Sequence, residues 1–246
     1  MTLEMLTELN RTVELARRVR AAAQADIPMK YGPVAGNKSI NATIYRCFKL
    51  IEEDDQRAFV KKFQRQPHDG DQVLHTFREL LLGAFLASNG FRVAHERPLD
   101  GKTPDWSILT DEGQLQCIVE GMTFHCGQTT ERKIMRSVET QGTWFGYPGP
   151  HDDRLHCALE AKASAYKALV EQADVAYVIG VFAHFHTALD ADEVREVVLT
   201  SDDCLFVHRP QVSGVLLFEE ASGPYRFSYI QNPSAHRSID IPSGLF

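Results

Sequence analysis

The sequence predicts a mixed α/β fold, in which a central mixed sheet is flanked by helices and preceded by an all-helical N-terminal region. Residues 105–121 hold two strand-like runs around the turn signal Asp111-Glu112-Gly113, which is typical of an antiparallel hairpin. Residues 175–182 form a continuous apolar run, as in a strand buried on both faces. A long helical pattern over residues 153–172 lies between them.

Length and composition are those of an ordinary globular protein. The chain has 246 residues, enough for one large domain or a domain with an extension, and 43% of them are hydrophobic and 24% charged. No apolar stretch is long enough to cross a bilayer, and residues 1–5 show no signal-peptide pattern. We therefore expect a cytoplasmic protein without a membrane partner.

Charge and cysteine content narrow the classes of function. The formal net charge is −7, which argues against a broad non-specific coat on nucleic acid but permits a local basic groove or contact through a metal ion. The five cysteines are scattered, and no CxxC pair occurs. The sequence therefore indicates neither a zinc knuckle nor a disulfide framework.

The N-terminal part is predicted to be helical. Helical spacing covers residues 2–24, 37–53 and 54–65, with a loop over residues 27–36. The polar stretch Gln66–Asp71 breaks helices, so we place a boundary there, between a helical region, residues 1–66, and an α/β domain, residues 71–246. The helical region is a candidate surface for a homodimer or another partner.

The second part opens with a helix over residues 72–89, whose apolar residues surround most of its circumference and predict burial on more than one side. Glu79 lies among these apolar neighbours. The later elements are strands over 91–96, 105–110, 115–121, 175–182, 212–218 and 225–230, helices over 129–139, 153–172 and 190–199, and a loop over 142–150.

Two carboxylates carry the main functional signal. Asp105 follows Pro104 at the start of one strand-like run, and Glu120 closes the next run. If the two strands pair as a hairpin, both carboxylates come together. Two carboxylates and a backbone carbonyl make a site for a hard divalent cation such as Mg²⁺, the usual tool for cutting a phosphodiester.

This order of elements resembles the core of the restriction-endonuclease-like superfamily, the PD-(D/E)XK nucleases, over roughly residues 71–235. The family signature is Pro-Asp, a spacer and Glu/Asp-x-Lys, with a glutamate on the preceding helix. The resemblance implies a restriction-endonuclease-like fold and a site for Mg²⁺ or Mn²⁺. Its ligands would be Glu79, Asp105, Glu120 and the carbonyl of Gly121.

One position departs from the family pattern. The lysine should stand two residues after Glu120, where this chain has Met122. A thioether can neither deprotonate water nor steady charge on a phosphate. Either a lysine arrives from another element, with Lys162 the first choice and Lys133 the second, or the site is degenerate and the fold is kept for binding.

The leading hypothesis is a Mg²⁺-dependent nuclease acting on DNA, with Asp105, Glu120 and Lys162 as catalytic residues. The residues expected to contact substrate are Gln128, Arg132, Lys133, Arg136 and Tyr166. The alternatives are a catalytically inactive domain that binds nucleic acid or protein, and an interaction protein that works through residues 1–66.

Each of these residues also has a plain structural explanation, such as a turn residue for Asp105 or an exposed helix face for the basic residues. The histidines and cysteines offer two further alternatives. A transition-metal site could draw on His125, Cys126, His151, His156, Cys157, His184 and His186, although their spacing matches no familiar zinc pattern. A nucleophilic site could pair Cys126 or Cys157 with His184.

Overall fold

The computed structural model describes residues 40–65, 70–141, 152–183, 187, 189–200, 203–220 and 224–246. The predicted helix over 2–24 and the predicted loops over 27–36 and 142–150 lie outside these residues. The chain divides into two compact units, residues 1–95 and 96–246, which are considered one at a time.

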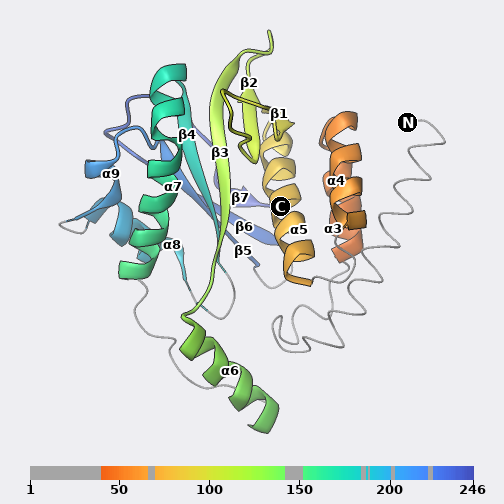
Figure 1. Ribbon diagram of the computed structural model, residues 1–246, viewed down its shortest axis with the longest axis vertical. Helices are drawn as coiled ribbons and strands as arrows, with labels where there is room; N and C mark the ends of the chain where they lie inside the picture. Colours follow the sequence, from red (N-terminus) through yellow and green to blue (C-terminus); the bar gives the residue numbers. More distant parts are fainter. Residues whose placement is uncertain are drawn as a thin grey trace. The chain divides into compact units, whose positions relative to one another are not determined.

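The described part of the first unit is three helices and a strand (Figure 1): α3 (Ile40–Phe48), α4 (Glu53–Arg65), α5 (Gly70–Ser88) and β1 (Arg92–His95). The sequence boundary at 66–71 falls between α4 and α5, but α5 belongs to the same unit as α3 and α4. The physical reason is the apolar circumference of α5, which contacts both of these helices. Leu80, Leu81 and Leu82, three consecutive positions around α5, are all fully buried.

The second unit contains a mixed sheet of strands β2 (Trp106–Leu109), β3 (Leu115–Phe124), β4 (Ala176–Ala183), β5 (Gly214–Glu220), β6 (Tyr225–Gln231) and β7 (Gly244–Leu245). Each strand neighbours the next one in the sequence. The β3–β4 and β4–β5 pairs are parallel, whereas β2–β3, β5–β6 and β6–β7 are antiparallel. The predicted mixed α/β class and the predicted hairpin are confirmed.

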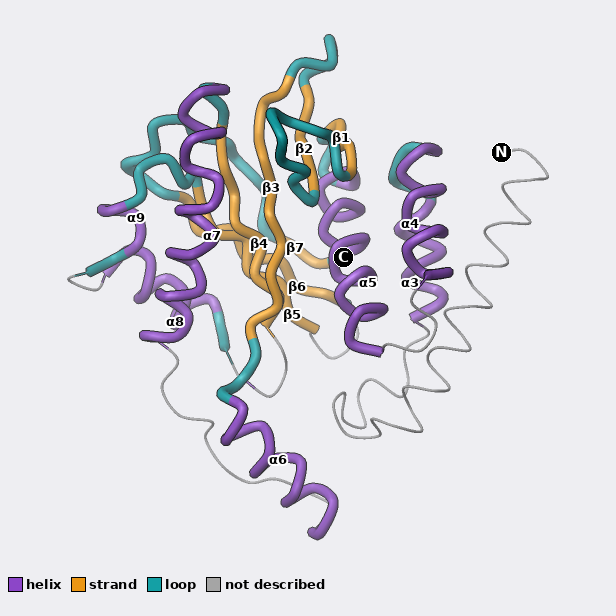
Figure 2. The backbone as a smooth tube through the Cα atoms, in the orientation of Figure 1, coloured by secondary structure: helices purple, strands orange, loops and turns teal. Residues whose placement is uncertain are grey.

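Helices accompany this sheet (Figure 2): α6 (Gln128–Gln141), α7 (Asp152–Ala173), α8 (Ala191–Arg195), a π-helix (Glu196–Thr200) and α9 (Leu205–His208). α7 packs on β3 and β4, with Leu155, Leu159 and Ala163 in the same apolar core as Ile118 and Ile179. Every residue of β4 is buried, as its apolar run predicts. Among the described helices, none has the length and apolarity needed to cross a membrane.

Two expectations need correction. The strand predicted to end at Gly121 continues to Phe124, because β4 pairs with it in parallel along its length, from Cys117 opposite Ala176 to Phe124 opposite Ala183. Glu120 therefore lies inside a strand rather than at its end. The single helix predicted over 190–199 is a short α-helix capped by Asp190, followed by a π-helix.

Candidate active site

The β2–β3 hairpin brings Asp105 and Glu120 together. Trp106 pairs with Val119, which places Asp105 beside Glu120 at the open end of the hairpin. Two hydrogen bonds join them: the backbone N–H of Asp105 donates to Glu120 Oε1 over 3.0 Å, and the N–H of Gly121 donates to Asp105 Oδ2 over 2.7 Å. Both carboxylates therefore have fixed positions.

The Glu120 carboxylate is buried beside a lysine amine. Glu120 is only 4% exposed, and a buried carboxylate requires a partner that offsets its loss of hydration. Lys162 of α7 supplies one, with its Nζ 2.9 Å from Glu120 Oε2. The Lys162 side chain is 32% exposed, so Lys162 contacts both the buried carboxylate and the solvent.

Helical spacing explains why Lys162 reaches the sheet. Leu155, Leu159, Lys162 and Tyr166 follow one another at three- and four-residue intervals and so share one face of α7. Leu155, Leu159 and Tyr166 belong to the core that α7 makes with the sheet. Lys162 is carried toward β3 with them.

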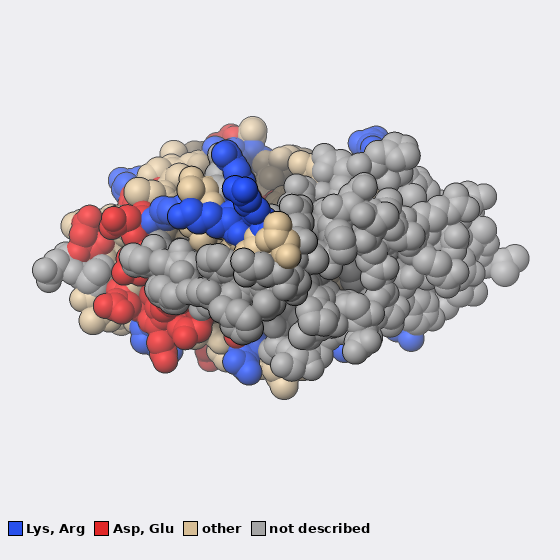
Figure 3. Space-filling model, turned by 90° about the horizontal axis from the view of Figure 1, so that it is seen from below, with Lys and Arg blue, Asp and Glu red and all other residues tan. Residues whose placement is uncertain are grey.

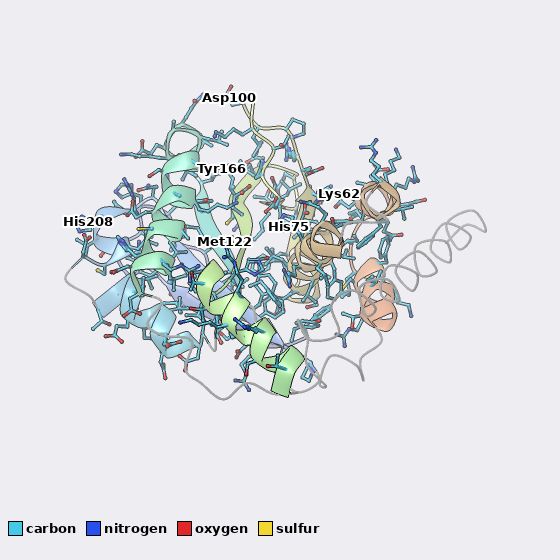
Figure 4. All side chains as sticks on the ribbon, turned by 60° about the horizontal axis from the view of Figure 1, so that its bottom comes forward. Lys62, His75, Asp100, Met122, Tyr166 and His208 are labelled. Carbon is cyan, nitrogen blue, oxygen red and sulfur yellow. The ribbon has the colours of Figure 1, made fainter. Side chains whose placement is uncertain are left out.

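Met122 occupies the position at which the resemblance to the PD-(D/E)XK nucleases would place a lysine. Because side chains alternate along a strand, Met122 lies on the same face of β3 as Glu120. It packs against the apolar core that includes Leu155 and Tyr166, and Figure 4 shows Met122 and Tyr166 both beside α7. The amine next to Glu120 thus comes from α7, and the strand position is apolar.

Two stacked tyrosines complete the site. The rings of Tyr166 and Tyr177 lie 5.6 Å apart, and the Tyr177 hydroxyl donates to the carbonyl of Lys162 over 3.1 Å. Burial, followed by the negative charge of Glu120 and Asp105, raises the pKa of both phenols, which stay protonated around neutral pH. Lys102 places its Nζ 5.1 Å from the centre of the Tyr166 ring.

Sequence reasoning did not single out Lys102 or Tyr177. Lys102 stands three residues before Asp105 in the segment Gly101-Lys102-Thr103-Pro104-Asp105. Its nearness in sequence to the Pro-Asp motif is the signal that could have identified it. Tyr177 is a polar-tipped residue in an otherwise apolar strand, and its hydroxyl needs a partner when buried.

Glu79 belongs to the first unit, where it makes a buried ion cluster. Its Oε1 lies 2.7 Å from Lys62 Nζ and 2.5 Å from His95 Nε2. Burial opposes ionisation of Glu79, but the hydrogen bond from His95 and the charge of Lys62 together lower its pKa. That Glu79 joins Asp105 and Glu120 at one cation stays a prediction.

The basic residues expected to meet substrate lie on α6. Arg132, Lys133 and Arg136 are exposed, and Figure 3 shows Lys and Arg side chains gathered on the face seen from below, the side at which α6 lies in Figure 1. Lys162, rather than Lys133, is the lysine that contacts Glu120. Gln128 is the first residue of α6, and its side chain lies outside the described part.

The described residues give little support to a transition-metal site or a Cys–His nucleophilic site built from the histidines and cysteines. His151, His184 and His186 lie outside them. Of the rest, His125, Cys126, His156 and Cys157 form no group of three metal-ligating side chains within the described part of the chain.

The donor set beside β3 suits a hard cation. Asp105 and Glu120 offer carboxylate oxygens, and Gly121 offers a carbonyl next to them in the chain. Mg²⁺ and Mn²⁺ prefer such oxygens, whereas Zn²⁺ and Cu²⁺ favour imidazole and thiolate.

Comparison of the chain with protein-family models, curated proteins and solved structures gives no match.

Proposed function

We propose that this chain is a Mg²⁺- or Mn²⁺-dependent nuclease that hydrolyses phosphodiester bonds, with DNA as the expected substrate. The observation that carries the proposal is the meeting of Asp105 and Glu120 on adjacent strands, with the Lys162 amine 2.9 Å from Glu120. Paired carboxylates next to a lysine are suited to hold a divalent cation against a negatively charged phosphate.

The arrangement of elements supports a restriction-endonuclease-like fold. Pro104-Asp105 immediately precedes β2, Glu120 lies in the antiparallel partner β3, and α6 and α7 come between this hairpin and the parallel strand β4. This is the order that the resemblance implies. The proposal includes a cytoplasmic location, where the enzyme would meet nucleic acid.

Each residue of the site has a distinct part in this mechanism. Asp105, Glu120 and the Gly121 carbonyl would hold the cation, which when bound supplies Lewis-acid charge to the phosphate and to water. Lys162, steadied by Glu120, would offset the negative charge that develops on the phosphate oxygens. Protonated Tyr166 would orient the substrate without adding charge.

Residues of α6 would contact the substrate at a distance from the reacting bond. Arg132, Lys133 and Arg136 are exposed and would bind flanking phosphates, which position nucleic acid without reading its sequence. Gln128 would orient substrate or water. A small basic surface of this kind is compatible with a net charge of −7.

A second candidate is a catalytically inactive domain that binds nucleic acid or protein. The observation in its favour is Met122, an apolar side chain packed against the core where the family has its lysine. The hydrogen bonds of Asp105 and Glu120 to backbone N–H groups would then serve the hairpin alone.

Cleavage assays test the proposal. The full chain is incubated with supercoiled plasmid, single-stranded DNA and RNA, with Mg²⁺, Mn²⁺ or EDTA. Asp105→Asn and Glu120→Gln keep one oxygen that can accept the backbone N–H and remove the negative charge, so they should lower cleavage by about 10²-fold or more in a folded protein. Lys162→Met should also lower cleavage by about 10²-fold or more.

Lys167→Ala is the matched control, since Lys167 lies on α7 but is half-exposed and pairs with Glu171. It should cleave like the wild-type chain. Calorimetric titration with Mn²⁺ measures binding by the same variants. Cleavage that survives both carboxylate substitutions would contradict the site, and a wild-type chain that binds DNA but neither cleaves it nor binds Mn²⁺ would favour the binding domain.

A further inference from the structure

A tight turn holds Lys102 next to the site. Leu99 and Lys102 exchange two backbone hydrogen bonds of 2.8 and 2.9 Å around Asp100 and Gly101. Both central residues have positive φ, 45° for Asp100 and 80° for Gly101, which is the pattern of a two-residue type I′ turn. The turn fixes the backbone of Lys102 three residues before Asp105.

The Lys102 side chain rests on an aromatic ring. Its Nζ lies 5.1 Å from the centre of the Tyr166 ring, within the range of a cation–π interaction. Among the described residues, no carboxylate pairs with Lys102. No acidic side chain in the described part of the chain therefore offsets the charge of Lys102, whereas Glu120 offsets the charge of Lys162.

Solvent exposure decreases from Lys102 through Tyr166 to the buried carboxylate of Glu120. Lys102 is exposed, Tyr166 is 9% exposed, and Glu120 is 4% exposed. Tyr166 lies between the other two, since its ring contacts Lys102 and its side chain hydrogen-bonds Glu120. The amine of Lys102 thus marks the solvent side of the site.

Tyr166 is a rigid platform for this amine. Its ring stacks on Tyr177, whose hydroxyl donates to the α7 backbone at Lys162. The face of the Tyr166 ring attracts the ammonium without neutralising its charge. The ammonium therefore keeps its donors for an incoming anion.

We infer that Lys102 binds a phosphate of the substrate backbone, adjacent to the phosphate at Asp105 and Glu120, with the Tyr166 ring as its support. This inference rests on the proposed nuclease function and extends it to a substrate-binding residue outside the carboxylate–lysine set. A lysine ammonium suits a phosphate as a point charge with several donors, and such contacts are independent of base sequence.

The test measures binding and cleavage separately. Binding of a short fluorescein-labelled DNA duplex is followed by fluorescence anisotropy over a series of salt concentrations, in the Asp105→Asn background so that the duplex stays intact. Lys102→Met keeps the length of the side chain and removes its charge. It should weaken binding about fivefold and reduce the slope of log affinity against log salt by about one.

Three further variants separate a phosphate contact from a structural effect. Lys102→Arg should restore affinity and slope, because it keeps the charge and the ring contact. Tyr166→Leu removes the platform and should make the effect of Lys102→Met smaller. Lys167→Ala removes the charge of a half-exposed lysine of α7 that pairs with Glu171, and it should leave the salt slope unchanged.

In the cleaving chain, Lys102→Met should raise KM with little change in kcat. A wild-type chain that cleaves, with Lys102→Met equal to it in KM and salt slope, overturns this inference alone. A chain that never cleaves but loses affinity and salt slope on Lys102→Met overturns the nuclease proposal and supports the phosphate contact. A chain that neither cleaves nor binds the duplex overturns both.

Discussion

At the scale of single residues, the site is built around one buried carboxylate. Glu120 accepts a hydrogen bond from the Asp105 backbone with one oxygen and contacts the Lys162 amine with the other. Removing the Lys162 amine would leave the buried Glu120 carboxylate without a compensating charge. Met122, on the same face of β3, cannot replace the lysine.

A lysine exchange tests whether Lys162 does the work that the proposed nuclease function assigns to a lysine at position 122. Lys162→Met should lower cleavage by about 10²-fold. Adding Met122→Lys should restore part of it, because position 122 shares the face of Glu120. Single-turnover cleavage rates measure the effect.

Met122→Lys alone should cost about 1–3 kcal/mol of the free energy of unfolding, because it places an amine against the apolar core. Urea denaturation measures this cost. A folded double variant no more active than Lys162→Met would show that the strand position cannot supply the amine.

At the scale of elements, the sheet holds the site through tight contacts between strands. β5 supports β4, which in turn pairs with β3 opposite Glu120. At the start of β5, a Cβ on Gly214 would lie 2.5 Å from the Tyr229 side chain. The Tyr229 hydroxyl donates to the carbonyls of Ser213 and Ile239, so its ring has little freedom to move.

Gly214→Ala should therefore destabilise the protein by about 1–3 kcal/mol. The added methyl group collides with a ring that two hydrogen bonds hold in place. Gly244→Ala is the control within the same sheet, because a Cβ there would meet no atom within 4 Å. It should change the urea midpoint little, and equal effects of both substitutions would contradict the role of Tyr229.

At the scale of the whole molecule, the chain combines two compact units with different polar centres. The first unit, residues 1–95, buries Glu79 between Lys62 and His95, and the second contains the Asp105–Glu120–Lys162 site. Burial raises the pKa of Asp55, a neighbour of His95, and so its effect on stability has the opposite sign to that of Glu79.

The first unit should lose stability in acid through Glu79. Its pKa in the folded state is lowered, so its contribution is present above the ordinary glutamate pKa and is lost as pH falls through the folded value. Glu79→Gln should cost about 3 kcal/mol at neutral pH and should flatten the decline of stability between about pH 6 and pH 3.

Urea denaturation at several pH values checks this expectation. Glu53→Gln is the control in the same unit, since Glu53 is 46% exposed and its pair with Arg57 is at the surface. It should change stability by less than about 1 kcal/mol. Equal pH dependence in the wild-type chain and Glu79→Gln would contradict the role of this cluster.

Local pattern was enough to predict much of the described fold. Periodicity and turn residues predict the hairpin, the buried strand β4 and the long helix α7, because each depends on neighbouring residues. The extension of β3 to Phe124 depends on pairing with β4, and the grouping of α5 depends on α3 and α4. Contacts between segments that are distant in the sequence cannot be predicted from the local sequence pattern.

The sequence by itself indicated that Asp105 and Glu120 could meet, because turn residues and alternating side chains predict the hairpin. The exact pairing depends on a register shift between Ile108 and Leu109, which the turn does not fix. Only the tertiary structure decided which amine meets them. Lys162 stands 42 residues from Glu120 and Lys102 meets Tyr166 across a longer stretch of sequence, so each contact depends on how α7 packs against the sheet. Packing is a property of the assembled apolar core, and no short segment encodes it alone.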